Sequence, residues 1–411
     1  MLNTSRLNYF HSWDLTDVKL HGRLISMFKR ILEGQLPQQS FFLFGPRQVG
    51  KSTLLGHLKT ILSVDLLDPE KQLLYSKDPG LLTKQVEATS GKGLVLIDEI
   101  QKVPKLLDVI HAMIEKHSGL RFAMSGSSAR KLRHGAANLL GGRALYRTLH
   151  PLTPDEIGDR FNLDWALAYG TLPKIYSLLQ EGKETLVQDL LRTYVITYLK
   201  EEIKAEAIVR NLQGFQNFLD VAAAQFAEQV NFADIARSCA VAYSTVREFY
   251  GILEDTLMGF LLYPCIKSAR KRLSHSPKFY FFDNGVTRAM LGTLRSAPSA
   301  MERGRLFEQW FIQEVYRLNQ YGQKDWKLSF WRTSYGAEVD LVIERGNVIV
   351  CGIECKLKKN IAGADLSGMR SFRDAHPKAR CYVAAPVELP LVLDRVKVLP
   401  PAAMLEVLKR Y

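Results

Sequence analysis

A run of nine residues near the N-terminus has the residue types and the spacing that bind phosphate groups. The run comprises Gly45, Pro46, Arg47, Gln48, Val49, Gly50, Lys51, Ser52 and Thr53, and its first eight residues satisfy G-x-x-x-x-G-K-[ST]. Glycines let backbone N–H groups converge on phosphate oxygens, and a helix that begins directly afterwards adds partial positive charge. The run therefore predicts an ATP site, in which Lys51 reaches the β- and γ-phosphates and the Ser52 hydroxyl ligates Mg²⁺.

Two acidic residues, Asp98 and Glu99, follow the apolar run Gly93-Leu-Val-Leu-Ile. An apolar run of this length is typical of a buried parallel strand. We expect Asp98 to hold Mg²⁺, directly or through water, and Glu99 to polarise the attacking water. A buried strand that ends in two acids is common by itself, so this prediction depends on the phosphate-binding run that precedes it.

Two further polar features belong to the same predicted site. The next apolar run ends at Ser125-Gly126-Ser127, where Ser127 or Ser125 would sense the γ-phosphate or orient the water; the alternative is an ordinary turn. Arg143 follows two glycines, and transition-state charge on a transferred phosphoryl group often needs a guanidinium from a neighbouring subunit. We expect Arg143 to supply it, the alternative being a plain surface arginine.

A second set of acids lies near the C-terminus. Glu308 lies on a predicted helix, Asp340 in the apolar run Ala337-Glu-Val-Asp-Leu-Val-Ile, and Glu354-Cys-Lys356 ends the next run. Carboxylates on adjacent strands can hold one or two Mg²⁺ ions that activate water for phosphodiester cleavage, and Lys356 would orient that water or neutralise charge. Acids and lysines on half-exposed strands are frequent, so the pattern is weak without Glu308.

Strand periodicity constrains this second site. Glu354 and Lys356 share one face of a strand, whereas Cys355 points to the other face. A three-residue loop, Arg345-Gly346-Asn347, would pair Asp340 with Gly352 and make Glu354 its diagonal neighbour, roughly 7–8 Å away. A two-residue turn would place the two acids on opposite faces. The sequence therefore predicts the three-residue loop.

The segment from Asn231 to Arg247 has the spacing of a helix-turn-helix. Ser244 or Thr245 would cap its second helix. The residues expected to pack inward are Ile235, Ala236, Val241 and Val246. The residues expected to face outward, toward phosphates or base edges, are Tyr243, Thr245, Arg247 and Tyr250.

A basic stretch without acids follows the helix-turn-helix, and it would form a wing beside the strand-like run Phe279-Tyr-Phe-Phe. Its basic residues are Lys267, Arg270, Lys271, Arg272 and Lys278. Such a wing can neutralise DNA phosphates and make binding sensitive to salt. The alternative is a winged-helix lid that only packs against its neighbours.

The elements that position these residues change in type along the chain. Strand-like runs from Phe41 to about His150 alternate with helical segments such as 51–62 and 105–116, which indicates an α/β domain with a parallel sheet. From the proline-rich boundary after His150 to about Thr293 the pattern is mainly helical. A helix over 301–321 then precedes strands over 327–332, 338–343, 348–356 and 379–384, an α/β arrangement.

With these motifs in place, the chain resembles the AAA+ P-loop ATPases, and more narrowly a bacterial and archaeal group with a restriction-endonuclease-like C-terminal domain of the PD-(D/E)xK type. The resemblance covers most of the chain and implies ring assembly, with Arg143 acting across the subunit boundary. It also implies an ATP-binding domain over 1–150, a helical lid with a winged helix over 151–295, and a nuclease-like domain over 296–411. The motifs that carry it are Gly45–Ser52, Leu96–Gln101, Ser125–Ala129, Gly142–Ala144, Tyr169–Pro173 and the C-terminal acids.

Composition limits the class of protein and of partner. The chain has 411 residues, 47% of them hydrophobic and 24% charged, which is typical of a folded protein with more than one domain. A formal charge of +13 favours an anionic partner such as nucleic acid, although a merely basic protein is the alternative. Five cysteines without metal-site spacing, and no long apolar run, favour a reducing compartment, the cytoplasm, and no membrane partner.

The sequence thus predicts an ATPase with ATP and Mg²⁺ as cofactors, and the resemblance implies a homo-oligomeric ring as its assembly. It would bind DNA and remodel it or translocate on it, with Mg²⁺-dependent nuclease activity as a further expectation for the C-terminal domain. The alternative is a nucleotide-controlled switch or scaffold, whose nuclease-like domain binds partners without cleaving DNA.

Overall fold

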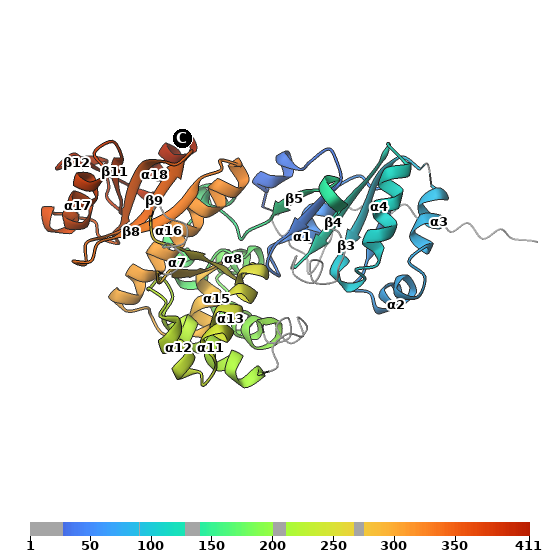
Figure 1. Ribbon diagram of the computed structural model, residues 1–411, viewed down its shortest axis with the longest axis horizontal. Coiled ribbons are helices and arrows are strands. Elements are labelled where there is room, and N and C mark those ends of the chain that lie inside the picture. Colours follow the sequence, from blue (N-terminus) through green and yellow to red (C-terminus); the bar gives the residue numbers. More distant parts are fainter. Residues whose placement is uncertain (1–27, 90, 128–139, 200–210, 267–274) are drawn as a thin grey trace, which may run out of the picture.

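The computed structural model describes residues 28–89, 91–127, 140–199, 211–266 and 275–411. Figure 1 shows an N-terminal α/β part, a mainly helical part in the middle of the chain, and a C-terminal part built on a second sheet. The protein is therefore an α/β protein of the expected class. No helix in these ranges combines the length and the apolar character that crossing a bilayer requires.

The N-terminal part is built on a five-stranded parallel sheet. Its strand order is β2-β3-β4-β1-β5, so β4 lies between the strand before the phosphate-binding run and the strand that ends at Asp98. The strands are β1 (Phe41–Phe44), β2 (Leu62–Asp65), β3 (Gly93–Asp98), β4 (Leu120–Gly126) and β5 (Leu145–Thr148). The helices are α1 (Lys51–Gly56), α2 (Pro69–Lys77), α3 (Leu81–Glu87) and α4 (Leu106–Lys116).

One predicted helix of this part is too long. The expected helix over 51–62 ends at Gly56, and Leu62 instead begins the edge strand β2. Helical side-chain spacing continues past Gly56 in the sequence, but Leu62, Ser63 and Val64 pair with β3 and form a strand instead. Tertiary pairing overrides local propensity here.

The middle part begins with a helix start that local chemistry specifies. The Thr153 hydroxyl accepts a hydrogen bond from the backbone N–H of Glu156, whose carboxylate accepts one from the backbone N–H of Thr153 in return. The helices that follow are α6 (Pro154–Ile157), α7 (Leu163–Tyr169), α8 (Pro173–Gln180), α9 (Glu184–Thr193), α11 (Leu212–Ala224), α12 (Phe232–Ser238), α13 (Tyr243–Asp255) and α15 (Asn284–Met290). Two antiparallel strands, β6 (Gly259–Leu262) and β7 (Lys278–Phe281), follow α13, and β6 packs against that helix.

The C-terminal part begins with the long helix α16 (Ala300–Gly322). Its six-stranded sheet has the order β12-β13-β11-β10-β9-β8, with β10, β11 and β13 parallel. The strands are β8 (Lys327–Arg332), β9 (Glu338–Arg345), β10 (Val348–Cys355), β11 (Arg380–Ala384), β12 (Leu391–Leu393) and β13 (Val396–Leu399). Helices α17 (Ser367–Ala375) and α18 (Pro401–Lys409) cover the sheet.

The strand β7 lies where the middle part of the chain meets the C-terminal part. Just after it, the buried carboxylate of Asp283 accepts hydrogen bonds from the backbone N–H groups of Thr171, 2.8 Å away, and Val286, 3.1 Å away. The Arg317 guanidinium, from α16, donates to the carbonyl oxygen of Phe282 at 3.0 Å. Gly170 leaves room for this joint, because a Cβ atom there would lie 2.0 Å from the Asp283 carboxylate.

Substitution of Gly170 tests the joint. Gly170→Ala should lower the free energy of unfolding by about 3 kcal/mol or more, because the new methyl group overlaps a buried carboxylate and the backbone has φ +74°. Gly182→Ala is the matched control, since Gly182 has φ +70° but open space around its Cβ position. That control should cost about 1 kcal/mol. Equal losses in chemical denaturation would show that the Asp283 joint contributes nothing.

Candidate functional site

The phosphate-binding run begins directly after β1 and ends in the first turn of α1, as expected. Gly50 has φ +93° and Gln48 φ +64°, conformations that turn successive backbone N–H groups to one side. The buried Lys51 ammonium donates to the carbonyl oxygens of Gly45 at 2.7 Å and Pro46 at 3.0 Å, while Ser52 is exposed beside it. Phosphate oxygens bound in this loop would compete with these two carbonyl oxygens for the Lys51 protons.

Arg30 supports this loop from the segment before β1. Its guanidinium is 7% exposed and donates to the carbonyl oxygens of Val49 and His150, both at 2.6 Å, and to the Glu156 carboxylate at 3.0 Å. One side chain therefore joins the phosphate loop to the start of the helical part. Sequence reasoning did not identify Arg30, because a single arginine before a strand carries no recognisable spacing.

The acidic strand end and the serine strand end meet at the same edge of the sheet. The Ser125 hydroxyl donates to the Asp98 carboxylate and accepts from the backbone N–H of Glu99 at 3.1 Å. Gln101 donates through Nε2 to the Glu99 carboxylate and to the Ser127 hydroxyl, the latter at 3.2 Å. Asp98, Glu99, Ser125 and Ser127 thus form one hydrogen-bonded group, in which Gln101 is the member that sequence reasoning cited only as part of a resemblance.

The edge of the sheet also decides what Arg143 can reach. Arg143 precedes β5, so it lies where the parallel strands begin, opposite to the edge that holds the phosphate loop. Its guanidinium pairs with Glu115 at the end of α4, and its side chain is 39% exposed. Arg143 therefore contacts a neighbour on its own side of the sheet, and a role at a phosphate site remains a prediction that requires a second subunit.

The helix-turn-helix is formed by α12 and α13, but two of its expected details are wrong. Neither Ser244 nor Thr245 caps α13, which begins after Ala242 without a side-chain cap. Tyr250 does not face outward: it is fully buried against Phe218, Phe232 and Phe279, because the wing strand β7 covers its side of the helix.

Other parts of that expectation agree with the structure. Ile235, Ala236 and Val246 are buried, and Val241 is partly buried against the same core. Tyr243 and Arg247 are exposed and both contact the ring of Phe232, while Thr245 is partly exposed. Four of the predicted wing residues, Lys267, Arg270, Lys271 and Arg272, lie outside the described residues.

The hairpin that carries Asp340 and Glu354 has a different turn from the one expected. Arg345 pairs with Val348, so the turn has two residues, Gly346 and Asn347, with φ +56° and +65°. A bulge between Ile349 and Cys351 then adds one residue to β10 and shifts the register. Continuing the shifted register from the Leu341–Ile353 pair sets Asp340 opposite Glu354, on the same face.

The predicted acids do come together, but around a lysine. The ammonium of Lys278, from β7, lies 2.9 Å from Glu308, 2.6 Å from Glu338 and 3.7 Å from Asp340. The Tyr280 hydroxyl also donates to Glu308, at 2.7 Å, and Lys356 pairs with Glu354 at 2.6 Å. Lys278 is 5% exposed, so its expected place on an exposed basic wing is wrong.

The residues as arranged do not fit a Mg²⁺ ion. Within the described ranges, no three histidine, cysteine or acidic side chains converge as a metal site would require. Burial, and then the neighbouring carboxylates of Glu354 and Glu308, raise the pKa of Asp340 well above its ordinary value. Of the expected metal ligands, Glu308 and Asp340 therefore face the Lys278 ammonium and Glu354 pairs with Lys356, and no reaction step is derived through a metal there.

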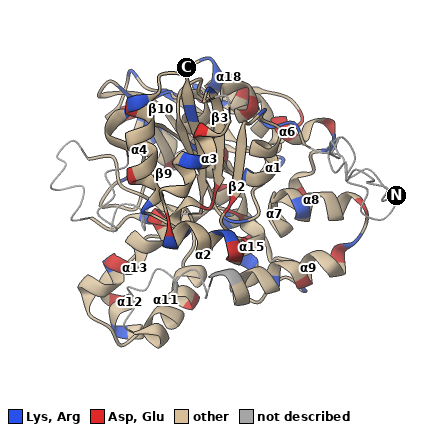
Figure 2. Ribbon diagram, turned by 90° about the vertical axis from the view of Figure 1, so that its right-hand side faces the viewer, with Lys and Arg blue, Asp and Glu red and all other residues tan. Residues whose placement is uncertain are grey.

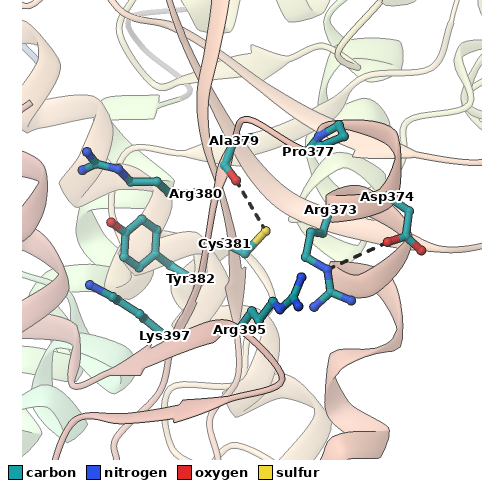
Figure 3. A pocket seen from close by; sticks show the side chains of 9 residues that line it. All are labelled: Arg373, Asp374, Pro377, Ala379, Arg380, Cys381, Tyr382, Arg395 and Lys397. Atoms are coloured by element: carbon teal, nitrogen blue, oxygen red, sulfur yellow. Dashed lines mark hydrogen bonds and ion pairs between the residues drawn. The ribbon is translucent and has the colours of Figure 1, made fainter.

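A basic hollow lies on another side of the C-terminal sheet, at the beginning of β11. It has a volume of about 720 Å³, and Figure 3 shows cationic side chains around Tyr382 and Cys381. Arg373 is engaged with Asp394 and Arg380 with Tyr411, whereas Arg395 and Lys397 form no ion pair with any residue that the structure describes. An anion is the ligand that such a lining attracts.

Comparison with known proteins divides the chain into three consecutive matches. Residues 37–158 match the model of an AAA domain, residues 160–297 a domain of unknown function, DUF8612, and residues 303–404 a domain of unknown function, DUF4143. The first match supports the AAA resemblance for the part that contains the phosphate loop. The second and third describe no activity, so the resemblance to restriction endonucleases remains a prediction.

Two curated relatives cover most of the chain. They are uncharacterized proteins of Mycobacterium bovis and Mycobacterium tuberculosis, each 28% identical over 308 residues, which is 74% of this chain and 67% of the relative. Among solved structures, the Walker-type ATPase PABY2304 of Pyrococcus abyssi has a TM-score of 0.45 and 14% identity, covering 67% of this chain and 99% of its own. The ORC2 protein of Aeropyrum pernix in its ADP form has a TM-score of 0.29 and 11% identity, and the match covers 63% of this chain and 89% of the ORC2 chain. Both similarities are too distant to support a conclusion about function.

The histidine beside the phosphate loop makes stability depend on pH. Burial, and then the charges of Arg317 and Arg30, lower the pKa of His150 to about 3. Below about pH 6.5 the histidine takes up a proton in the unfolded chain but stays neutral in the folded chain. The free energy of unfolding therefore decreases as pH falls. The loss from this group should reach about 2 kcal/mol at pH 5. Between pH 7 and pH 5, the free energy of unfolding of His150→Phe, measured by urea denaturation, should fall by that much less than the free energy of the natural sequence. Identical pH profiles of the two proteins would contradict the assignment.

Proposed function

We propose that the chain is a Mg²⁺-dependent ATPase that engages DNA and assembles as a homo-oligomer, in the manner of ring-forming ATPases. The observation that carries the proposal is the folded phosphate loop, with Lys51 at its centre, at the sheet edge where Asp98 and Glu99 end β3. Each residue type at this edge suits nucleotide hydrolysis, and the AAA match over residues 37–158 agrees with it.

The roles of the residues follow from their positions. Backbone N–H groups of residues 45–50 and the Lys51 ammonium would bind the β- and γ-phosphates. Ser52 and Asp98 would hold Mg²⁺, which neutralises phosphate charge when bound. Glu99 would accept the proton of the attacking water, oriented by Gln101 and Ser127. Arg143 would stabilise the transferred phosphoryl group of a neighbouring subunit, because its own phosphate loop lies at the opposite sheet edge.

DNA engagement is proposed from exposed cationic and aromatic groups. The helices α11, α12 and α13 project at the lower left of the view in Figure 2, so Tyr243 and Arg247 on α13 are accessible to a large partner. The basic hollow gives a second contact on the C-terminal sheet. Coupling of ATP turnover to these surfaces would drive remodelling of DNA or translocation on it.

The second candidate is a nucleotide-controlled switch or scaffold. One apolar core runs from β1 through the helical part into α16 and the C-terminal sheet, so a nucleotide-driven change in the loop can reach the partner-binding surfaces without rapid turnover. In this alternative the C-terminal domain binds a partner and does not cleave DNA.

ATP hydrolysis measured with and without duplex or branched DNA separates the two candidates. A motor should be stimulated severalfold by one of these DNA structures, whereas a switch should hydrolyse ATP slowly and at an unchanged rate. Lys51→Ala should abolish ATP binding in equilibrium dialysis. Glu99→Gln should bind ATP yet lose about 10²- to 10⁴-fold in turnover, because it removes the general base.

The matched control for the acid is Glu87→Gln, which removes an exposed carboxylate on α3. It should hydrolyse ATP at the rate of the natural sequence. Wild-type turnover in Glu99→Gln, or failure of the natural sequence to bind ATP at millimolar concentration, would contradict the proposal.

The basic hollow gives an independent prediction for DNA binding. Replacing both Arg395 and Lys397 by alanine should weaken duplex binding and reduce the slope of log affinity against log salt by about 2, because two phosphate contacts are lost. The control variant replaces Lys84 and Lys116, which removes the same charge from exposed positions of the N-terminal part. Equal weakening in both variants, measured by fluorescence anisotropy, would exclude the hollow as a DNA contact.

A further inference from the structure

The acids of the C-terminal domain are neutralised by a residue that the winged helix supplies. Lys278 is the first residue of β7, and its ammonium lies within 2.9 Å of carboxylate oxygens of both Glu308 and Glu338. The same ammonium lies 3.7 Å from Asp340. These three acids come from α16 and β9, so the contact joins the winged helix to the part of the second sheet that carries the predicted nuclease residues.

Because this contact is buried, removing only one of its charged partners strongly destabilises the fold. Lys278 is 5% exposed, and Asp340 and Glu354 are 7% and 8% exposed. A buried charge without a partner costs several kcal/mol, so the acids require a cation, and Lys278 requires the acids. Two carboxylates within 2.9 Å of the Lys278 ammonium provide this compensation.

The cluster retains one acceptor that the lysine does not satisfy. The Oε2 atom of Glu354 is buried and has no hydrogen-bond partner, while its Oε1 atom accepts from Lys356. The Asp340 Oδ2 atom accepts from the backbone N–H of Cys355 at 2.8 Å. Glu354 therefore keeps one acceptor oxygen without a hydrogen-bond partner. The Lys278 ammonium occupies the space among the other acids, Glu308, Glu338 and Asp340.

We propose that Lys278 is the resident cation of this cluster and excludes divalent metal from Glu308 and Asp340. A divalent cation binds carboxylate oxygens at about 2.1 Å, and it cannot share them with an ammonium already in contact with the same oxygens. The nuclease metal site that the sequence predicts is therefore filled by a lysine of the same chain. This inference is independent of ATP hydrolysis at the phosphate loop.

Manganese binding to the full-length chain without nucleotide tests the proposal. Mn²⁺ is followed by electron paramagnetic resonance, which reports free and bound ion and needs no enzymatic activity. The natural sequence should bind no Mn²⁺ at the acid cluster. Lys278→Met, which keeps the length of the side chain and removes its charge, should gain one site at least about tenfold tighter than any site in the natural sequence. Adding Asp340→Asn should remove that site, and Lys278→Arg should exclude Mn²⁺ as the lysine does.

A second variant keeps the test decisive if the uncompensated acids prevent folding. Lys278→Met combined with Glu338→Gln removes one charge of each sign and leaves the three expected ligands intact. Its midpoint of thermal unfolding should rise with Mn²⁺, whereas that of the natural sequence should not.

Two results would overturn the inference. The first is Mn²⁺ binding by the natural sequence that disappears in the Asp340→Asn variant, because the ammonium would then not exclude metal. The other is a folded Lys278→Met variant, single or double, that gains no Mn²⁺ site, which would make the cluster a purely structural ion pair between the two domains.

Discussion

The architecture depends on the short strand β7 and the residues that follow it, because this segment is hydrogen-bonded to β6, to the turn before α8 and to the helix α16. Gln309 and Gln313 of α16 bind the backbone N–H and carbonyl groups of Phe281, and β6 pairs with the strand as its antiparallel neighbour. Asp283 then satisfies backbone donors of the helical lid. A buried backbone group must find a partner, so the segment fixes the relative positions of the elements that provide those partners.

The phosphate loop is connected to this joint through a few buried polar groups. Arg30 binds the loop at Val49 and also the carbonyl oxygen of His150. The backbone N–H of His150 in turn donates to the Tyr321 hydroxyl of α16, at 3.1 Å. The loop and α16 are therefore connected through Arg30 and the backbone of His150.

Charge balance distinguishes the two acidic centres of the molecule. Asp98 and Glu99 have neutral hydroxyl and amide groups as their hydrogen-bond partners. Glu308 and Glu338 of the C-terminal part instead contact the ammonium of Lys278, which comes from the middle part of the chain. Similar acidic motifs thus have neutral partners in one centre and a cationic partner in the other.

The sequence by itself determined the α/β class, the loop between β1 and α1 with the acidic end of β3, and α16 with the strands β8 to β11, because these depend on short-range spacing and on the alternation of apolar residues. It did not predict α17, β12, β13 and α18. It also determined that Asp340 and Glu354 share a face, but by the wrong route. A bulge at Val350 replaced the three-residue turn, and backbone register is set by pairing that no local pattern records. Only the tertiary structure decided that Tyr250 is buried and that Lys278 enters the acid cluster. Both outcomes arise from β7 packing against distant elements, and the charge and size of a side chain do not specify which distant neighbour it will meet.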